Sequence, residues 1–171
     1  LSLGVRRMVK RHALIRRLSA VETLGCTTVI CSDKTGTLTQ DQMTVRQIYA
    51  GGKLMKVSGV GYEPKGQFQL DGEVADVSQD TAVQTLMKIG TLCNDTRLVT
   101  VDGVWGIKGD PTEGALVVVS AKAGLLQEEA NERFPRVDEI PFSSERKRMT
   151  TIHNTPGGRI AYSKGAPEIV L

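Results

Sequence analysis

Residues 27–39 read TTVICSDKTGTLT and join an apolar run to a loop rich in threonine. The run from Thr27 to Cys31 is β-branched and apolar, which predicts a buried strand. The strand leads into Asp33 and a tight turn at Gly36. Open α/β sheets bind ligands beyond the carboxyl ends of their strands. We therefore expect Asp33 to present a carboxylate at a ligand site of this kind.

The residues around Asp33 suit phosphate chemistry. Backbone N–H groups of the turn, with the hydroxyls of Thr35 and Thr37, can hold phosphate oxygens. A carboxylate placed there can attack phosphorus and form an acyl phosphate. Mg²⁺ would neutralise the phosphate and hold it in line. Residue types alone do not decide the question, because an aspartate in such a loop is more often a capping residue than a nucleophile.

The complete heptad settles the interpretation, because DKTGTLT at residues 33–39 matches the phosphorylation signature of P-type ATPases at every position. Further segments resemble the type II, calcium-pump-like members of that family and occur in family order. They are AVETLGCTTVICSDKTGTLTQDQMT at 20–44, CND at 93–95, KGDPTEGAL at 108–116, FSSERKRM at 142–149 and KGAPE at 164–168. The resemblance covers essentially the whole chain and indicates a P-type cation-transporting ATPase.

The resemblance implies roles for the phosphorylation loop. Asp33 would accept the γ-phosphate of ATP, and Lys34 and Thr35 would orient that phosphate. The Asp33 side chain and the Thr35 carbonyl would bind Mg²⁺. Phosphatases of the haloacid-dehalogenase type carry a second aspartate, as acid and base, where this chain has Thr35. Threonine lacks a carboxylate for that role, which argues against one alternative, a phosphatase with a cap domain. The other alternative is a non-catalytic nucleotide-binding module.

The resemblance also implies an ATP site in the second half of the chain. Phe142 would stack on the adenine ring, and Glu113 would accept a hydrogen bond from the adenine amino group. Lys147 and Lys164 would supply positive charge, and Gly165 would let the backbone approach the base. The full set expected to contact nucleotide is Glu113, Phe142, Ser144, Lys147, Met149, Lys164, Gly165 and Ala166.

Each of these signals is weak when taken alone. Phe142 by itself would usually be a core residue, and Lys147 lies in a basic run that would usually be solvated. Glu113 stands three residues after Asp110, as in a helix-capping pair. Ser144 departs from some relatives of the family, which place a basic residue there. The joint order of the motifs favours the functional interpretation.

The expected fold is α+β, an antiparallel sheet flanked by helices and preceded by a strand and loop from an α/β phosphorylation domain. Residues 1–25 would be a basic stalk segment, residues 26–45 the start of the phosphorylation domain, and residues 46–171 a nucleotide-binding domain that the family continues past KGAPE. The predicted elements are hairpins across 45–70 and 98–105, helices at 80–93, 111–123 and 128–134, and strands at 136–141, 149–154 and 159–164.

Composition limits the remaining classes. The chain has 40% hydrophobic and 24% charged residues, which is typical of a globular protein, and no apolar run long enough to cross a bilayer. Six basic residues fall within the first 17, around a helical pattern from Val5 to Ala13. They favour a helix at the cytoplasmic face of a membrane, with a solvated helix face as the plainer alternative. Interleaved aromatics are missing, so nucleic-acid binding is not expected.

Cys26, Cys31 and Cys93 lack metal-site spacing and are expected to be buried reduced thiols, and His12 and His153 are isolated. The expected partners are ATP, the remaining domains of the same pump, and further copies of the chain through unpaired strand edges. The resemblance favours Ca²⁺ as the transported ion, although related pumps move Na⁺, K⁺, Mg²⁺ or H⁺. It also implies that this piece alone does not turn over ATP, because the later phosphorylation-domain motifs are absent.

Overall fold

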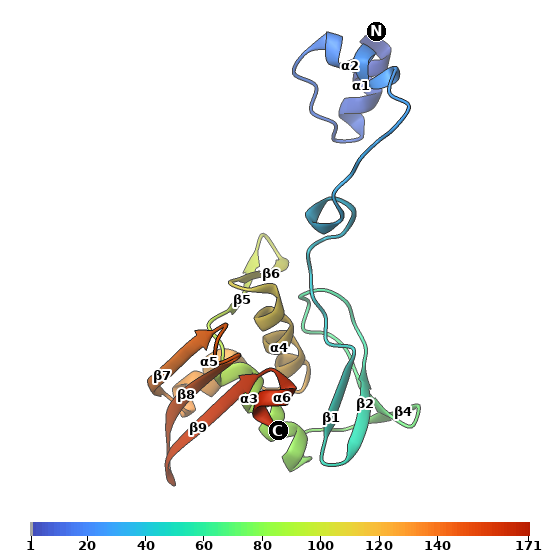
Figure 1. Ribbon diagram of the computed structural model, residues 1–171. Coiled ribbons are helices and arrows are strands. Elements are labelled where there is room, and N and C mark those ends of the chain that lie inside the picture. The colour runs from blue at the N-terminus through green and yellow to red at the C-terminus, as the bar shows by residue number, and fades with distance from the viewer. Residues whose placement is uncertain (1) are drawn as a thin grey trace. The chain divides into compact units, whose positions relative to one another are not determined.

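The computed structural model describes residues 2–171 and divides into two compact units, Leu1–Gln40 and Asp41–Leu171 (Figure 1). The first unit contains α1 (Ser2–Lys10), α2 (Leu18–Gly25) and a single irregular helical turn, η1 (Lys34–Leu38). Helix α1 carries Arg6, Arg7 and Lys10, three of the six basic residues in the first 17, and confirms the helical pattern predicted there. Across residues 2–171, every helix is too short or too polar to cross a membrane.

The strand predicted at Thr27–Cys31 is not formed, so that prediction was wrong. Val29 and Ile30 are 75% and 81% exposed, and no described strand pairs with this segment. A strand requires a neighbour for its backbone N–H and C=O groups. An apolar run that finds no such partner stays extended and open to solvent. Cys26 and Cys31 are exposed for the same reason, whereas Cys93 is buried as expected.

The second unit holds all the strands that the structure describes. They are β1 (Gln47–Ala50), β2 (Lys53–Val57), β3 (Phe68–Leu70), β4 (Glu73–Ala75), β5 (Arg97–Val101), β6 (Val104–Lys108), β7 (Arg136–Ser143), β8 (Arg148–Thr155) and β9 (Gly158–Gly165). Its helices are α3 (Thr81–Leu92), α4 (Pro111–Lys122), α5 (Gln127–Arg133) and α6 (Pro167–Val170). Every predicted helix and hairpin from residue 45 onward is confirmed, with shifts of a few residues at the ends.

Local turn chemistry fixes three of the hairpins. Gly51-Gly52, Asp71-Gly72 and Asp102-Gly103 each have positive φ at both residues and join directly paired strands. That backbone is the type I′ turn, whose twist matches the twist of antiparallel strands. Glycine and aspartate tolerate it, because they reach the left-handed region at low cost.

All the strand pairs are antiparallel, which confirms the α+β class, but the strands form three sheets instead of one. The sheets are a meander β1-β2-β3-β4, a hairpin β5-β6 and a three-stranded sheet β7-β8-β9. Figure 1 shows α3 and α4 side by side between the meander and the β7–β9 sheet.

Helix α3 connects the two hydrophobic cores of this unit. Its first half buries Val83 and Met87 against the meander and α4. Its end buries Leu92 and Cys93 against α5, β8 and β9. The Asp80 carboxylate caps the start of α3 and accepts hydrogen bonds from the N–H groups of Ala82 and Val83. The helix therefore fixes the loop that follows Cys93 relative to β9.

His153 lies in the second core and is fully buried. Its Nδ1 is 2.8 Å from the carbonyl oxygen of Phe134, and its Nε2 is 2.9 Å from the Thr151 hydroxyl. A carbonyl can only accept, so Nδ1 carries the proton and Nε2 of the neutral ring accepts from Thr151. Burial lowers the pKa of His153, because the charged ring would lose hydration.

The unfolded chain should bind a proton at His153 more readily than the folded chain does. The stabilising contribution of neutral His153 is complete above the unfolded pKa of about 6.5 and is lost as pH falls through the lower folded pKa. We expect the free energy of unfolding, measured with urea, to decrease between about pH 7 and pH 5.5. His153→Gln should flatten this slope. His12→Gln, which changes an exposed histidine, should retain it. An unchanged slope in His153→Gln would contradict this assignment.

Candidate functional site

Helix α4 begins at a well-defined cap. The Asp110 carboxylate accepts hydrogen bonds from the N–H groups of Thr112 (2.8 Å) and Glu113 (3.1 Å), and Pro111 occupies the first helical position. The bond from the Glu113 N–H is the main cause of the lowered pKa of Asp110, and nearby Lys164 adds to it. Glu113 does not return a bond to the Asp110 N–H, which binds the Thr96 hydroxyl at 2.8 Å. The expected capping pair is therefore half formed.

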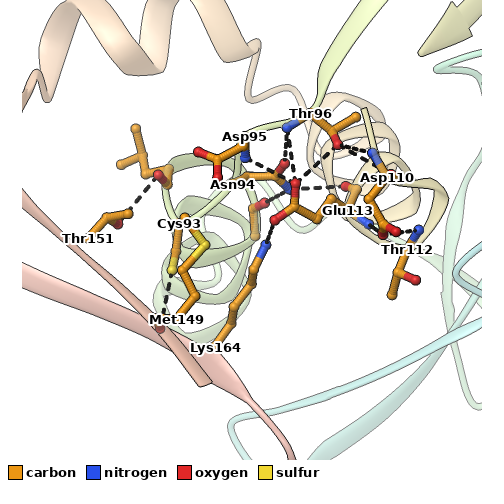
Figure 2. Close-up of polar contacts among 12 residues, drawn as sticks. Cys93, Asn94, Asp95, Thr96, Asp110, Thr112, Glu113, Met149, Thr151 and Lys164 are labelled. Atoms are coloured by element: carbon orange, nitrogen blue, oxygen red, sulfur yellow. Dashed lines mark hydrogen bonds and ion pairs between the residues drawn. The ribbon is translucent and has the colours of Figure 1, made fainter. Parts of the chain in front are cut away.

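The Glu113 carboxylate lies at the centre of a polar cluster (Figure 2). Its Oε1 is 2.6 Å from Lys164 Nζ on β9. Its Oε2 accepts three hydrogen bonds of 3.1 Å, from the N–H groups of Asp95 and Thr96 and from the Thr96 hydroxyl. The side chains of Glu113 and Lys164 are 19% and 21% exposed. A partly buried ion pair with this many donors has a fixed geometry.

The donors to Glu113 come from the loop after α3, which is shaped by Asn94. The Asn94 side chain donates from Nδ2 to the carbonyls of Gly90 (2.9 Å) and Glu113 (3.0 Å), and its Oδ1 accepts from the Thr96 N–H at 2.8 Å. Arg136 on β7 closes the loop from the other side and lies 2.7 Å from an Asp95 carboxylate oxygen. Figure 2 shows this loop against the start of α4.

A pocket of about 790 Å³ opens beside this cluster. Its volume falls in the range of roughly 300–1,000 Å³ common for small-molecule sites. Its lining residues come from the cap and first turns of α4, from the end of β7 and the turn that follows it, and from the end of β9. They are Asp110, Thr112, Glu113, Leu116, Phe142, Lys147, Lys164, Gly165 and Ala166. The structure thus gathers six of the eight predicted nucleotide contacts around one cavity.

Phe142 lies near the end of β7, and Lys147 is the last residue of the turn between β7 and β8. The Phe142 ring is 61% exposed, so it is not a core residue. Lys147 has φ of 49°, and its N–H donates to the carbonyl of Ser143 at 2.8 Å. Its Nζ is 3.6 Å from Glu168, and both side chains are largely exposed. This ion pair is weak, so Lys147 is available to a ligand in the pocket.

Two of the predicted contacts, Ser144 and Met149, do not line the pocket. Ser144 is exposed in the turn. Met149 is 2% exposed and packs in the second core beside Phe134 and Tyr162. Side chains alternate along a strand, and the inward position on β8 directs Met149 into the core. Met149 therefore belongs to the core, whereas Ser144 stays a predicted contact outside the lining of the pocket.

Gly165 has a packing role that the sequence interpretation did not anticipate. A Cβ atom at this position would lie 2.4 Å from the carbonyl oxygen of Lys147 and 2.6 Å from Arg148 Cβ. Gly165 pairs with Arg148 across β8 and β9, and the next residue, Ala166, donates its N–H to the Lys147 carbonyl at 2.9 Å. Glycine thus allows the end of β9 to meet the turn that carries Lys147.

Asp33, Lys34 and Thr35, the residues of the predicted phosphorylation loop, belong to the first unit and are exposed. Gly36 adopts φ of 70°, and the Thr39 N–H closes the loop onto the Lys34 carbonyl at 3.1 Å. Residues 2–171 hold no cluster of three or more histidine, cysteine or acidic side chains suited to a metal. A carboxylate and a backbone carbonyl are nevertheless the hard oxygen ligands that Mg²⁺ accepts, usually together with waters and substrate phosphates.

Sequence reasoning missed part of the site. Cys93-Asn94-Asp95 matches a family signature that by itself assigns no role, and Thr96, which contacts both Asp110 and Glu113, was not predicted. The available signal was Asn94 two residues before Thr96, a spacing typical of a turn closed by the asparagine side chain. Leu116, one helical turn after Thr112, also lines the pocket and was not predicted.

The chain thus folds into an α+β domain with a pocket of small-molecule size, lined by an aromatic ring, two acidic side chains and two lysines. The family model described as "P-type ATPase, cytoplasmic domain N" matches residues 82–171, and the chain belongs to this family.

Similar proteins agree with this assignment. The whole chain is 45% identical to a calcium-transporting ATPase of Bacillus subtilis over 172 residues and 50% identical to the cation-transporting ATPase pma1 of Synechocystis over 176 residues. It is 43% identical over 178 residues to the human calcium-transporting ATPase type 2C member 1. The chain spans about a fifth of the length of these curated relatives, 18–19% in each case.

The close packing at Gly165 predicts a local effect of substitution. Gly165→Ala should lower the free energy of unfolding by about 1–3 kcal/mol, because the added Cβ forces β9 away from Lys147 and Arg148. Gly157→Ala is the matched control, since its Cβ would meet only the Thr155 hydroxyl at 3.8 Å. Urea unfolding of the two variants tests this. Equal stabilities would show that the end of β9 relaxes freely.

Proposed function

We propose that this chain supplies the ATP-binding pocket and the phosphorylation loop of an ATP-driven cation pump. The observation that carries the proposal is the convergence of Phe142, Glu113, Lys147 and Lys164 on one pocket. An exposed aromatic ring, a fixed acceptor and two cations are the groups that an adenine nucleotide requires. The names of the relatives, which are cation- and calcium-transporting ATPases, support the same proposal.

The pocket offers one set of contacts to the base of the nucleotide and another to its phosphates. The face of Phe142 offers a stacking surface for the base, a contact worth roughly 1–3 kcal/mol. Glu113 Oε2 already accepts three bonds, whereas Oε1 accepts only from Lys164 among the contacts described. Oε1 therefore keeps capacity for the adenine amino group. Lys147 places positive charge where the phosphates would lie, and Lys164 balances the charge of Glu113 beside the base.

In the proposed reaction, a carboxylate oxygen of Asp33 attacks the γ-phosphorus of ATP. The new bond joins Asp33 to phosphorus, the bond from the γ-phosphorus to the bridging oxygen breaks, and ADP leaves with the electron pair. Lys34 and Thr35 would orient the phosphate. Mg²⁺, held by Asp33 and the Thr35 carbonyl, would neutralise phosphate charge. Because Thr35 replaces a second carboxylate, the acyl phosphate would persist long enough to drive a conformational change.

The proposal extends to the whole pump. Residues 1–25 would form a basic stalk segment at the cytoplasmic face of a membrane, residues 26–45 would open the phosphorylation domain, and residues 46–171 would form the nucleotide-binding domain. Ca²⁺ is the favoured ion. The partners would be ATP and the other domains of the pump. Self-association of the chain is also proposed, because within the part of the chain that the structure describes β9 pairs on one side only and leaves a sheet edge.

Removal of the stacking ring tests the pocket. The 171-residue chain should bind ATP or ADP with a dissociation constant on the order of 0.1–1 mM. NMR titration measures this constant. Phe142→Ala should weaken binding about tenfold or more, since stacking is lost. Ile140→Ala removes another exposed side chain of β7 that lies outside the pocket and should leave the affinity unchanged. Equal affinities for Phe142→Ala and Ile140→Ala would rule out the stacking role.

The nucleophile is tested in the intact pump. Asp33→Asn replaces the attacking carboxylate with an amide, so the acid-stable phosphoenzyme formed from radiolabelled ATP should disappear. Asp41→Asn, at another exposed aspartate eight residues along the chain, should retain it. Persistent label in the Asp33→Asn pump would show that another residue accepts the phosphate.

A further inference from the structure

We propose that Thr96 is a positioning residue of the nucleotide pocket. Its buried hydroxyl sets the orientation of the Glu113 carboxylate and through it the preference of the site for adenine. This inference rests on the proposed function, since it assigns how one of the groups in the ATP pocket is held. Thr96 itself does not line the pocket.

Thr96 is fully buried, and its hydroxyl has three polar neighbours. It accepts a hydrogen bond from the Asp110 N–H at 2.8 Å, and it lies 3.1 Å from Glu113 Oε2 and 3.2 Å from the Asp110 carbonyl. The hydroxyl has a single proton to donate. A charged acceptor makes the stronger bond, so the proton is directed to Glu113.

This bond determines which carboxylate oxygen faces the pocket. Thr96 and Asp95 together saturate Oε2 with three donors. Oε1 is left to pair with Lys164, which lines the cavity together with Glu113. Without the hydroxyl, Oε2 would keep only the two backbone donors, and the carboxylate could rotate so that either oxygen faces Lys164. The direction of Oε1 relative to a bound base would then no longer be fixed.

The surrounding backbone is built around this hydroxyl. Gly109 has φ of 139°, and a Cβ atom there would lie 2.2 Å from Thr96 Oγ1. Only glycine at position 109 lets the backbone come this close to Thr96. The close approach allows the Asp110 N–H to reach the Thr96 hydroxyl. Thr96 in turn holds both the cap of α4 and the acid of the pocket.

Base preference separates a positioning role from a purely structural one. The base of inosine diphosphate lacks the amino group of adenine and presents a carbonyl oxygen in its place. A correctly held Glu113 should therefore favour ADP over inosine diphosphate. The ratio of the two affinities refers to folded protein only, so a general loss of stability does not change it.

The experiment titrates the 171-residue chain with ADP and with inosine diphosphate by NMR. Thr96→Val keeps the side-chain shape and removes the hydroxyl. This variant should bind ADP about tenfold more weakly, because a charged hydrogen bond is lost. The ratio of its affinities for ADP and inosine diphosphate should then be close to one. Thr96→Ser restores the hydroxyl and should stay within about twofold of the parent chain. In a Glu113→Gln background, Thr96→Val should have little further effect on ADP binding, because the two residues act as a unit.

An unchanged ADP preference in folded Thr96→Val would overturn the inference and leave the proposed function intact. Absence of ADP binding by the parent chain would overturn both. Thr96→Ala provides a second variant if Thr96→Val does not fold. Failure of both to fold, with Thr96→Ser folded, would assign the hydroxyl to the fold and count against the positioning role.

Discussion

The carboxylate of Glu113 joins three segments that are distant in the sequence. It accepts from the loop at Asp95 and Thr96, it lies in the first turn of α4, and it pairs with Lys164 on β9. A partly buried charge is costly unless each oxygen has a donor. The pocket therefore requires these donors to hold the charged Glu113 in place. Their positions determine where Glu113 and Lys164 lie.

The two cores of the second unit make that arrangement possible. Helix α3 is buried against the meander at one end and against α5, β8 and β9 at the other. It delivers the Asn94 loop to the start of α4 and holds β9 at a fixed distance from it. Gly165 then lets the end of β9 meet the turn that carries Lys147. Phe142 remains outside both cores, which leaves its ring free for a ligand.

Sequence predicted most reliably what local chemistry controls. The turn at Asp102-Gly103 and the helix start at Asp110-Pro111 are both confirmed. In each case the residues themselves favour the backbone geometry that the structure has there. The strand at Thr27–Cys31 failed because its stability depends on a paired neighbour that the segment itself cannot supply. Among the site residues, the motifs indicated Glu113 and Lys164, whereas Met149 lies in the core by strand alternation. Thr96 was missed, because a threonine after a turn gives no sign of the carboxylate that it will contact.

The central claim is that the pocket between α4, β9 and the turn after β7 receives an adenine nucleotide. The most direct measurement is a map of backbone amide chemical-shift changes when ADP is added to the isotopically labelled chain. The account predicts that the changes concentrate at Asp95, Thr96, Glu113, Lys147 and Gly165, with the amides of the β1–β4 meander unaffected. Changes centred on the meander, or no saturable change anywhere in the second unit, would contradict it.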